Sequence, residues 1–186
     1  YTVRFANPSG ADSAASQVRI STLLDGDLSV RSFRLGDIKV GGVTIHVPQD
    51  RASFKGDFDL RNSLGFIVRV SAGVDPDSRV ATWLLQAIDP DTGEVLRDPV
   101  RGLLPPDANG KASGGFASYT LRALDTATTG ANITAAARVF FDATPPIVSA
   151  AVSHTLDAAP PVTTLTVASN GNNAAGQPTY KLNWKA

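Results

Sequence analysis

Apolar and polar residues alternate along several short runs of this chain, which is the pattern of half-buried β-strands. In the first run Tyr1, Val3 and Phe5 fall on one face, and Thr2 and Arg4 fall on the other. Clusters of Gly, Pro, Asn and Asp separate the runs and favour turns. The pattern predicts strands at about residues 1–6, 17–23, 31–35, 43–47, 53–60, 65–72, 79–88, 116–124 and 132–141.

These runs predict an all-β protein. About nine or ten strands are expected before Pro145, which suits a two-sheet, immunoglobulin-like β-sandwich. Glu94 is the only glutamate, while turn-forming residues are abundant, so helices are disfavoured. We expect Trp83 to lie in the core, and the runs 116–124 and 132–141 to pair as a hairpin across the turn at 125–130.

A five-residue box occurs twice near the end of the sequence, as Asp-Ala-Thr-Pro-Pro at 142–146 and as Asp-Ala-Ala-Pro-Pro at 157–161. A Pro-Pro pair gives no amide hydrogen to a sheet and forms a stiff, extended spacer, as between tandem modules. We therefore divide the chain into a sandwich module, residues 1–157, and a C-terminal part, residues 158–186. The second part is predicted to hold a linker and two further strands, at about 162–167 and 180–185, joined by a flexible loop at 168–177.

Two strands without partners are marginally stable in water. We expect them to begin a following module, to be exchanged with a neighbouring subunit, or to dock on the sandwich of the same chain. Their arrangement, with a second strand that ends in Asn183-Trp184, resembles the start of a fibronectin-type-III-like module. Because the chain begins with tyrosine and contains no methionine, we interpret it as a processed or excised piece. The strands most able to pair with another chain carry Tyr1, Val3, Phe5, Leu165, Val167, Tyr180, Leu182 and Trp184.

Several ordered blocks of residues point to one kind of domain. They include Leu24-Asp25-Gly26-Asp27-Leu28, Phe33-Arg34-Leu35-Gly36-Asp37-Ile38, and the long block from Leu85 through Asp89-Pro90-Asp91-Thr92-Gly93-Glu94. With these blocks, residues 1–157 resemble an immunoglobulin-like conserved-repeat domain of large secreted bacterial surface proteins. Such domains have no assigned activity, so the resemblance implies an extracellular or cell-surface location and an architecture. At Ile20-Ser21-Thr22 the chain departs from the family pattern, which has an aspartate before the leucines.

The charge of the chain excludes some partners. Lysine and arginine number 17, and aspartate and glutamate also number 17, so no net positive field attracts nucleic acid or an anionic membrane. No apolar stretch is long enough for a membrane-spanning helix, and membrane insertion is not expected. The chain has no cysteine, which excludes disulfides, thiolate metal sites and a cysteine nucleophile.

Acidic turns are the strongest chemical signal. Calcium prefers hard oxygen ligands, and closely spaced acidic residues in one loop can supply several of them. Asp89, Asp91 and Glu94 form the best trio, and Asp107 and Asn109 are the next candidates. The alternative explanation is that Asp and Asn favour turns through hydrogen bonds to the nearby backbone, and for each loop taken alone we prefer it.

No constellation for catalysis stands out in the sequence. The two histidines, His46 and His154, have no evident acidic or nucleophilic partner, and no nucleophile elbow or phosphate-binding loop is present. We therefore predict that the protein is not an enzyme.

The predicted function is a structural and adhesive module of an extracellular bacterial surface or filament protein. It would associate head to tail through edge strands, with calcium as a rigidifying ion. The alternative is a carbohydrate- or surface-polymer-binding module tethered to a larger protein. Exposed aromatics on a sandwich can stack on sugar rings, although packing in a core explains the candidates more simply. These candidates are Trp83, Tyr119, Tyr180 and Trp184.

Overall fold

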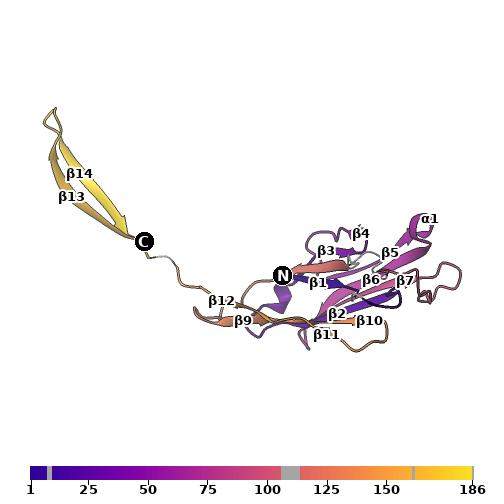
Figure 1. Cartoon of the computed structure of the whole chain (residues 1–186). Helices are drawn as coiled ribbons and strands as arrows, with labels where there is room; N and C mark the ends of the chain where they lie inside the picture. The colour runs from indigo at the N-terminus through magenta and orange to yellow at the C-terminus, as the bar shows by residue number, and fades with distance from the viewer. Residues whose placement is uncertain (8–9, 106–113, 161, 186) are drawn as a thin grey trace.

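The computed structural model describes residues 1–7, 10–105, 114–160 and 162–185. Two antiparallel sheets form a β-sandwich, and a two-stranded hairpin stands away from it at the C-terminal end of the chain (Figure 1). Within these residues regular structure is almost entirely strand, with one short α-helix, α1 (Arg61–Leu64), and one 3-10 turn (Val30–Ser32). The prediction of an all-β, immunoglobulin-like sandwich with two extra C-terminal strands is confirmed.

The two sheets differ in width. The smaller sheet has the order β1 (Thr2–Ala6), β8 (Gly114–Thr120), β3 (Arg34–Val40), β4 (Val43–Ile45). The larger sheet has the order β11 (Ile147–Val148), β10 (Ala137–Phe141), β2 (Gln17–Leu23), β7 (Val80–Ile88), β6 (Phe66–Asp75), β5 (Ser53–Leu60). A short ribbon of β9 (Asn132–Ala135) and β12 (Val152–Thr155) lies beside them, and the C-terminal hairpin is β13 (Thr164–Asn172) with β14 (Pro178–Lys185).

The core lies between the sheets and is centred on aromatic side chains. Trp83 of β7 is completely buried, as predicted, and its ring centroid lies 5.5 Å from that of Tyr119 on β8. Phe33, just before β3, is also completely buried and lies 6.1 Å from Trp83. Along β2, Val18 and Ile20 point into this core, as the alternating pattern requires.

The predicted hairpin between residues 116–124 and 132–141 is wrong. Strand β8 pairs with β1 and β3 in the smaller sheet, whereas β10 pairs with β2 and β11 in the larger one. Both strands bury alternate residues, Ala117 and Tyr119 on β8 and Val139 and Phe141 on β10. Alternation shows which face of a strand is buried, but it does not show which neighbour the strand pairs with, and here the chain crosses between sheets.

Three local predictions also need correction. The strand expected at 31–35 begins only at Arg34, because a 3-10 turn occupies Val30–Ser32. The run 132–141 is interrupted at Ala136, whose carbonyl accepts a 2.8 Å hydrogen bond from the Thr22 hydroxyl. The first half of the loop expected at 168–177 is strand, since β13 continues to Asn172, and only residues 173–177 form the turn.

The two proline boxes have different positions in the fold. Asp142 of the first box adopts a left-handed backbone (φ 48°), and its Oδ1 accepts hydrogen bonds from the amides of Ser16 (3.1 Å) and Gln17 (2.8 Å). The chain then reverses, and β11 pairs with β10, so this box is a turn within the larger sheet. The second box follows the last strand of the sandwich and leads to the C-terminal hairpin.

Gly115, in the middle of the smaller sheet, is required by close packing. A Cβ at this position would lie 2.1 Å from the Lys39 carbonyl oxygen and 2.8 Å from the Phe5 ring. We predict that Gly115→Ala lowers the free energy of unfolding by about 3 kcal/mol, because the backbone of β3 and a core ring cannot both move aside. Urea unfolding followed by circular dichroism measures this change. Gly42→Ala is the control, since nothing lies within 4 Å of its Cβ position; equal losses in both variants would contradict the packing explanation.

Candidate interaction surfaces

The C-terminal hairpin has a defined register. Leu165 lies opposite Trp184, Val167 opposite Leu182, and Ser169 opposite Tyr180. The connecting turn is organised by Asn173, whose Oδ1 accepts hydrogen bonds from the amides of Ala175 (3.0 Å) and Gln177 (2.9 Å). A side chain that accepts two backbone bonds makes a compact turn, so the hairpin has an internal order of its own.

This register places all large apolar side chains of the hairpin on one face. Residues directly opposite each other in an antiparallel pair share a face, and alternate residues share it along a strand. The five side chains are between 55% (Leu182) and 74% (Trp184) exposed. The opposite face is polar apart from one alanine. The apolar face of the hairpin consists of Leu165, Val167, Tyr180, Leu182 and Trp184, and the other face consists of Thr164, Thr166, Ala168, Lys181, Asn183 and Lys185.

The predicted partner-binding residues of β1 lie differently. Tyr1 and Val3 are partly buried against the core and Phe5 is buried, so their side chains face inward. The Tyr1 ring stacks on Tyr119 with centroids 5.3 Å apart. What β1 offers to another chain is therefore the backbone of its free edge, because among the described strands it pairs only with β8.

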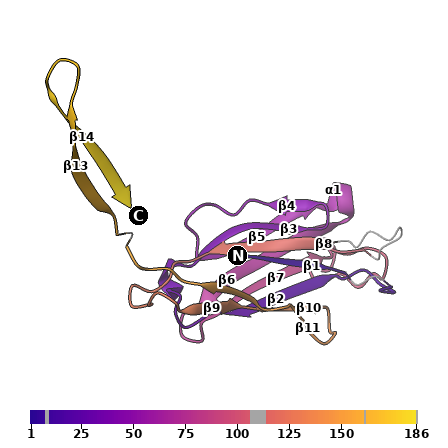
Figure 2. The ribbon, with the colours of Figure 1, turned by 60° about the vertical axis from the view of Figure 1, so that its left-hand side comes forward.

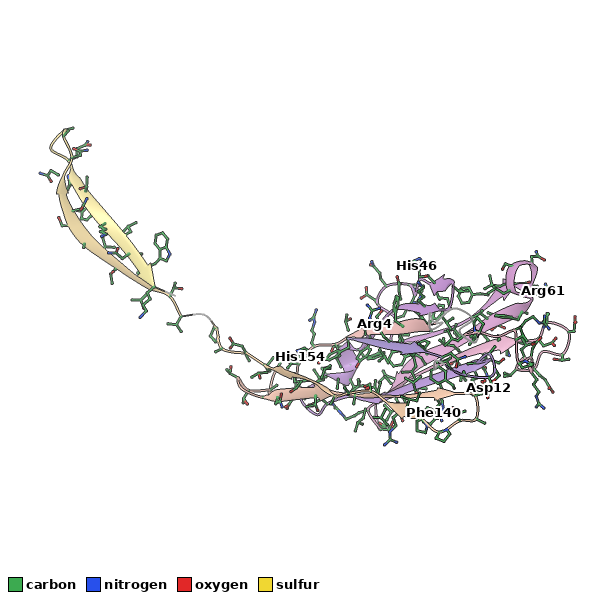
Figure 3. All side chains as sticks on the ribbon, in the orientation of Figure 1. Arg4, Asp12, His46, Arg61, Phe140 and His154 are labelled. Atoms are coloured by element: carbon green, nitrogen blue, oxygen red, sulfur yellow. The ribbon has the colours of Figure 1, made fainter. Side chains whose placement is uncertain are left out.

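A groove runs beside the free edge of β1, between it and the strands β10, β11 and β12. Its wider part, about 310 Å³, is lined by Tyr1, Val3 and Ala137 among others. Its narrower part, about 180 Å³, is lined by Phe5, Val139 and Ile147 among others. Arg4 and Ser149 border both parts, so we treat them as one groove, the β1 groove; Arg4 on β1 and His154 on β12 are labelled in Figure 3.

Exposed apolar residues also follow the outer strand beside the β1 groove. Ile147, Val148 and Val152 are 50%, 60% and 49% exposed. Sequence reasoning did not single out this strip, because the residues after the first proline box were interpreted only as a strand and not as a contact surface. The signal was present in the two β-branched residues directly after Pro146, which form an edge strand with no charged residue to protect it.

The acidic turns use their carboxylates as hydrogen-bond acceptors. Oδ1 of Asp89 accepts from the amides of Asp91 (2.8 Å) and Thr92 (3.3 Å), while Asp91 and Glu94 are exposed. Among the residues that the structure describes, no three His, Asp or Glu side chains are grouped closely enough to hold a metal ion. The other two candidates, Asp107 and Asn109, lie outside the described residues. Calcium binding stays a prediction, and the described trio by itself does not form a ligand shell.

Asp25 has a different role from the other turn residues. Its Oδ2 accepts hydrogen bonds from the Thr134 amide (2.9 Å) and hydroxyl (3.2 Å), which ties the turn after β2 to β9. The guanidinium of Arg79 donates to the carbonyls of Asp25 and Leu28 in the same turn. Hydrogen bonds from the Thr134 and Asp27 amides, together with the charge of Arg79, lower the pKa of Asp25 below its ordinary value.

The remaining candidate residues are scattered. His46 contacts Asp37 (2.9 Å) on an exposed strand end, and His154 meets the edge of the Tyr1 ring at 5.9 Å. Trp83 and Tyr119 are buried, and burial raises the pKa of the Tyr119 hydroxyl. Tyr180 and Trp184 are the exposed members of the four aromatic candidates, so the expectation that core packing explains them does not hold on this hairpin.

Comparison with protein-family models and with curated proteins finds no match for this chain. The resemblance of residues 1–157 to conserved-repeat domains therefore stays a prediction. In the described part of the chain, no helix has the length and apolar character needed to cross a membrane. Function has to be inferred from the surfaces themselves.

Asp25 gives a pH-dependent prediction. Its folded pKa is depressed, so its contribution to stability is complete above the unfolded value, near 4, and is lost as pH falls through the lower folded value. Asp25→Asn removes this contribution, so the difference in unfolding free energy between wild type and variant should shrink as pH falls from 6 toward about 2.5. Urea unfolding at a series of pH values measures it. Asp77→Asn is the control, because Asp77 contributes to its turn through its backbone amide, which donates to Asp75 Oδ1 and is kept in the variant. A difference in unfolding free energy between wild type and Asp25→Asn that does not change with pH would contradict the role of the Asp25 carboxylate.

Proposed function

We propose that this protein is a structural and adhesive module, not an enzyme, of an extracellular bacterial surface or filament assembly. It associates with neighbouring copies head to tail through its C-terminal hairpin. The apolar face of the hairpin is the main support for this proposal, since five large side chains stay exposed there on a pair of strands with unpaired outer edges. An isolated two-stranded hairpin is marginally stable in water, and a large exposed apolar face marks an interaction site.

The energy available from covering this face is large. Burying one exposed Leu or Val side chain completely stabilises by about 1.5–3 kcal/mol, and the face presents several such groups together with Tyr180 and Trp184. Aromatic side chains with a large exposed area are typical centres of protein interfaces. Docking of this face therefore supplies both the stability that an isolated hairpin lacks and the affinity of a subunit contact.

The linker supports docking on a separate body. Among the described residues, the last hydrogen bond to the sandwich runs from the Ala158 amide to the Thr129 hydroxyl (3.0 Å), and Pro160 and Pro161 follow in the sequence. Paired prolines favour an extended spacer. This supports a division into a sandwich module of residues 1–157 and a C-terminal part of residues 158–186 that reaches a neighbour. If each copy lends its hairpin to the next, the contact joins two different surfaces, and a contact that does not close on itself forms a filament.

A carbohydrate-binding module is the second candidate, and one observation favours it. Tyr180 and Trp184 lie on the same flat face of β14, and two exposed aromatics on one strand face form a platform on which sugar rings can stack. Trp83 and Tyr119 are buried, so the sandwich does not present these two rings to a sugar. The two candidates thus compete for the same hairpin face.

Replacement of three apolar residues on the hairpin tests the association. We predict that wild-type protein forms dimers or longer assemblies at micromolar concentration. The triple variant Leu165→Thr, Leu182→Thr, Trp184→Thr should associate roughly a hundredfold more weakly, because the buried apolar area is lost while threonine keeps the strand propensity. Light scattering and sedimentation, each in calcium and in chelator, measure the size of the assemblies and show whether assembly depends on calcium.

The control places three threonines on the other face of the hairpin, at Ala168, Asn183 and Lys185, and should associate like wild type. Equal weakening in both triple variants would mean that the apolar face is not the contact. Wild-type protein that stays monomeric in every condition, yet sediments with purified cell-wall polysaccharide unless Trp184 is replaced, would favour the carbohydrate-binding alternative.

A further inference from the structure

The free edge of β1 has backbone groups ready to pair with another strand. The Tyr1 backbone nitrogen donates to the Tyr119 carbonyl (2.8 Å), and the Tyr119 amide donates to the Tyr1 carbonyl (3.0 Å). In an antiparallel ladder such bonded pairs alternate, so Val3 and Phe5 also bond to β8. The N–H and C=O groups of Thr2, Arg4 and Ala6 consequently point to the free edge.

The surface beside this edge is apolar and recessed. The β1 groove is lined by Ala137, Val139 and Phe141, and on its far side by the exposed Ile147 and Val152. Val148 lies opposite Arg138 on the other face of β11 and does not line the groove. A strand added to β1 would extend the smaller sheet over the far side of the groove and bring alternate side chains down onto it. The smaller sheet has two strands fewer than the larger one, so a two-stranded hairpin makes the sheets equal in width.

Strand β13 suits this position better than the other strand of the hairpin. It contains no charged residue, whereas β14 carries Lys181 and Lys185. The β1 edge presents the exposed Arg4, which would repel a strand that carries lysines. Pairing through β13 keeps those lysines one strand away and turns Leu165 and Val167 toward the apolar far side of the groove. Strand β13 is nine residues long, and the free edge extends over about 17 Å, so β13 can cover all of it.

The connection favours a strand from a second copy. The chain runs along the groove from Ile147, near Phe5, toward His154, near Tyr1, and leaves the sandwich at that end. To reach its own β1 edge, β13 would have to reverse direction within residues 156–163, where the sequence has a Pro-Pro pair, and paired prolines favour an extended spacer over a turn. In both Figure 1 and Figure 2 the hairpin stands clear of the sandwich.

We propose that the β1 groove is the acceptor site for the hairpin, and that β13 of a second copy adds to the free edge of β1 as a further strand of the smaller sheet. The proposal rests on the proposed head-to-tail association and names its receiving surface. Main-chain hydrogen bonds to Thr2, Arg4 and Ala6 supply the pairing, and the apolar far side of the groove supplies the side-chain contact.

The substitution Arg4→Pro tests the acceptor edge. Proline removes an N–H that points away from β8, leaves the bonds between β1 and β8 intact, and is tolerated on edge strands. We expect Arg4→Pro, in the full chain, to associate at least tenfold more weakly than wild type by sedimentation and light scattering. Arg4→Ala, which keeps the N–H and removes the charge, should associate as well as wild type or better. Thermal unfolding of the sandwich in both variants checks that the fold is kept.

Cross-linking tests the same contact without disturbing the edge. The chain has no cysteine, so single cysteines can be placed on separate copies. A copy with Thr2→Cys, mixed with a copy with Thr166→Cys, should give a disulfide-linked dimer. The control is Lys55→Cys on β5, the edge strand of the larger sheet, which should give far less of this dimer when mixed with Thr166→Cys. If assembly is unchanged in Arg4→Pro and Lys55→Cys cross-links as well as Thr2→Cys, the β1 groove is not the acceptor site, although the proposed head-to-tail association is kept. Wild-type protein that is monomeric throughout would overturn both.

Discussion

The aromatic contact between the two sheets is the interaction on which the rest of the structure depends. Trp83 of the larger sheet packs on Tyr119 of the smaller one, Phe33 fills the space beside them, and Tyr1 stacks on the outer side of Tyr119. Because Tyr1 is bound by both its ring and its backbone, β1 is fixed as the outermost strand of its sheet. The free edge, the groove beside it and the exit of the chain near His154 all follow from that position.

The sequence predicted which residues face the core more reliably than it predicted which strands are neighbours. The strands at Gln17–Leu23 and Ser53–Leu60 match their predicted bounds, and Trp83 is buried as expected. The pairing of β8 and β10 was mispredicted, because residues close in sequence were assigned to one hairpin although they belong to opposite sheets. A period of two is a property of one strand, whereas pairing depends on long-range packing that no short segment contains.

The candidate surfaces were predicted in part. The alternation of Leu165 with Val167, and of Tyr180, Leu182 and Trp184, was visible in the sequence, but their common face depends on the register set by the Asn173 turn. The inward direction of Tyr1, Val3 and Phe5 followed from the same alternation. The free backbone edge of β1, and the exposed Ile147 and Val152 beside it, could be identified only once it was known which strand lies at the sheet edge.

The two tryptophans occupy opposite environments, and this gives the protein two separate optical reporters. Trp83 is completely enclosed and emits from an apolar site, whereas Trp184 is 74% exposed on the hairpin and emits from water. Any event that covers the hairpin should shift the emission of Trp184 to shorter wavelength while that of Trp83 stays constant. Unfolding of the sandwich should shift Trp83 in the other direction. Intrinsic fluorescence therefore distinguishes docking of the hairpin from loss of the fold in a single unlabelled sample.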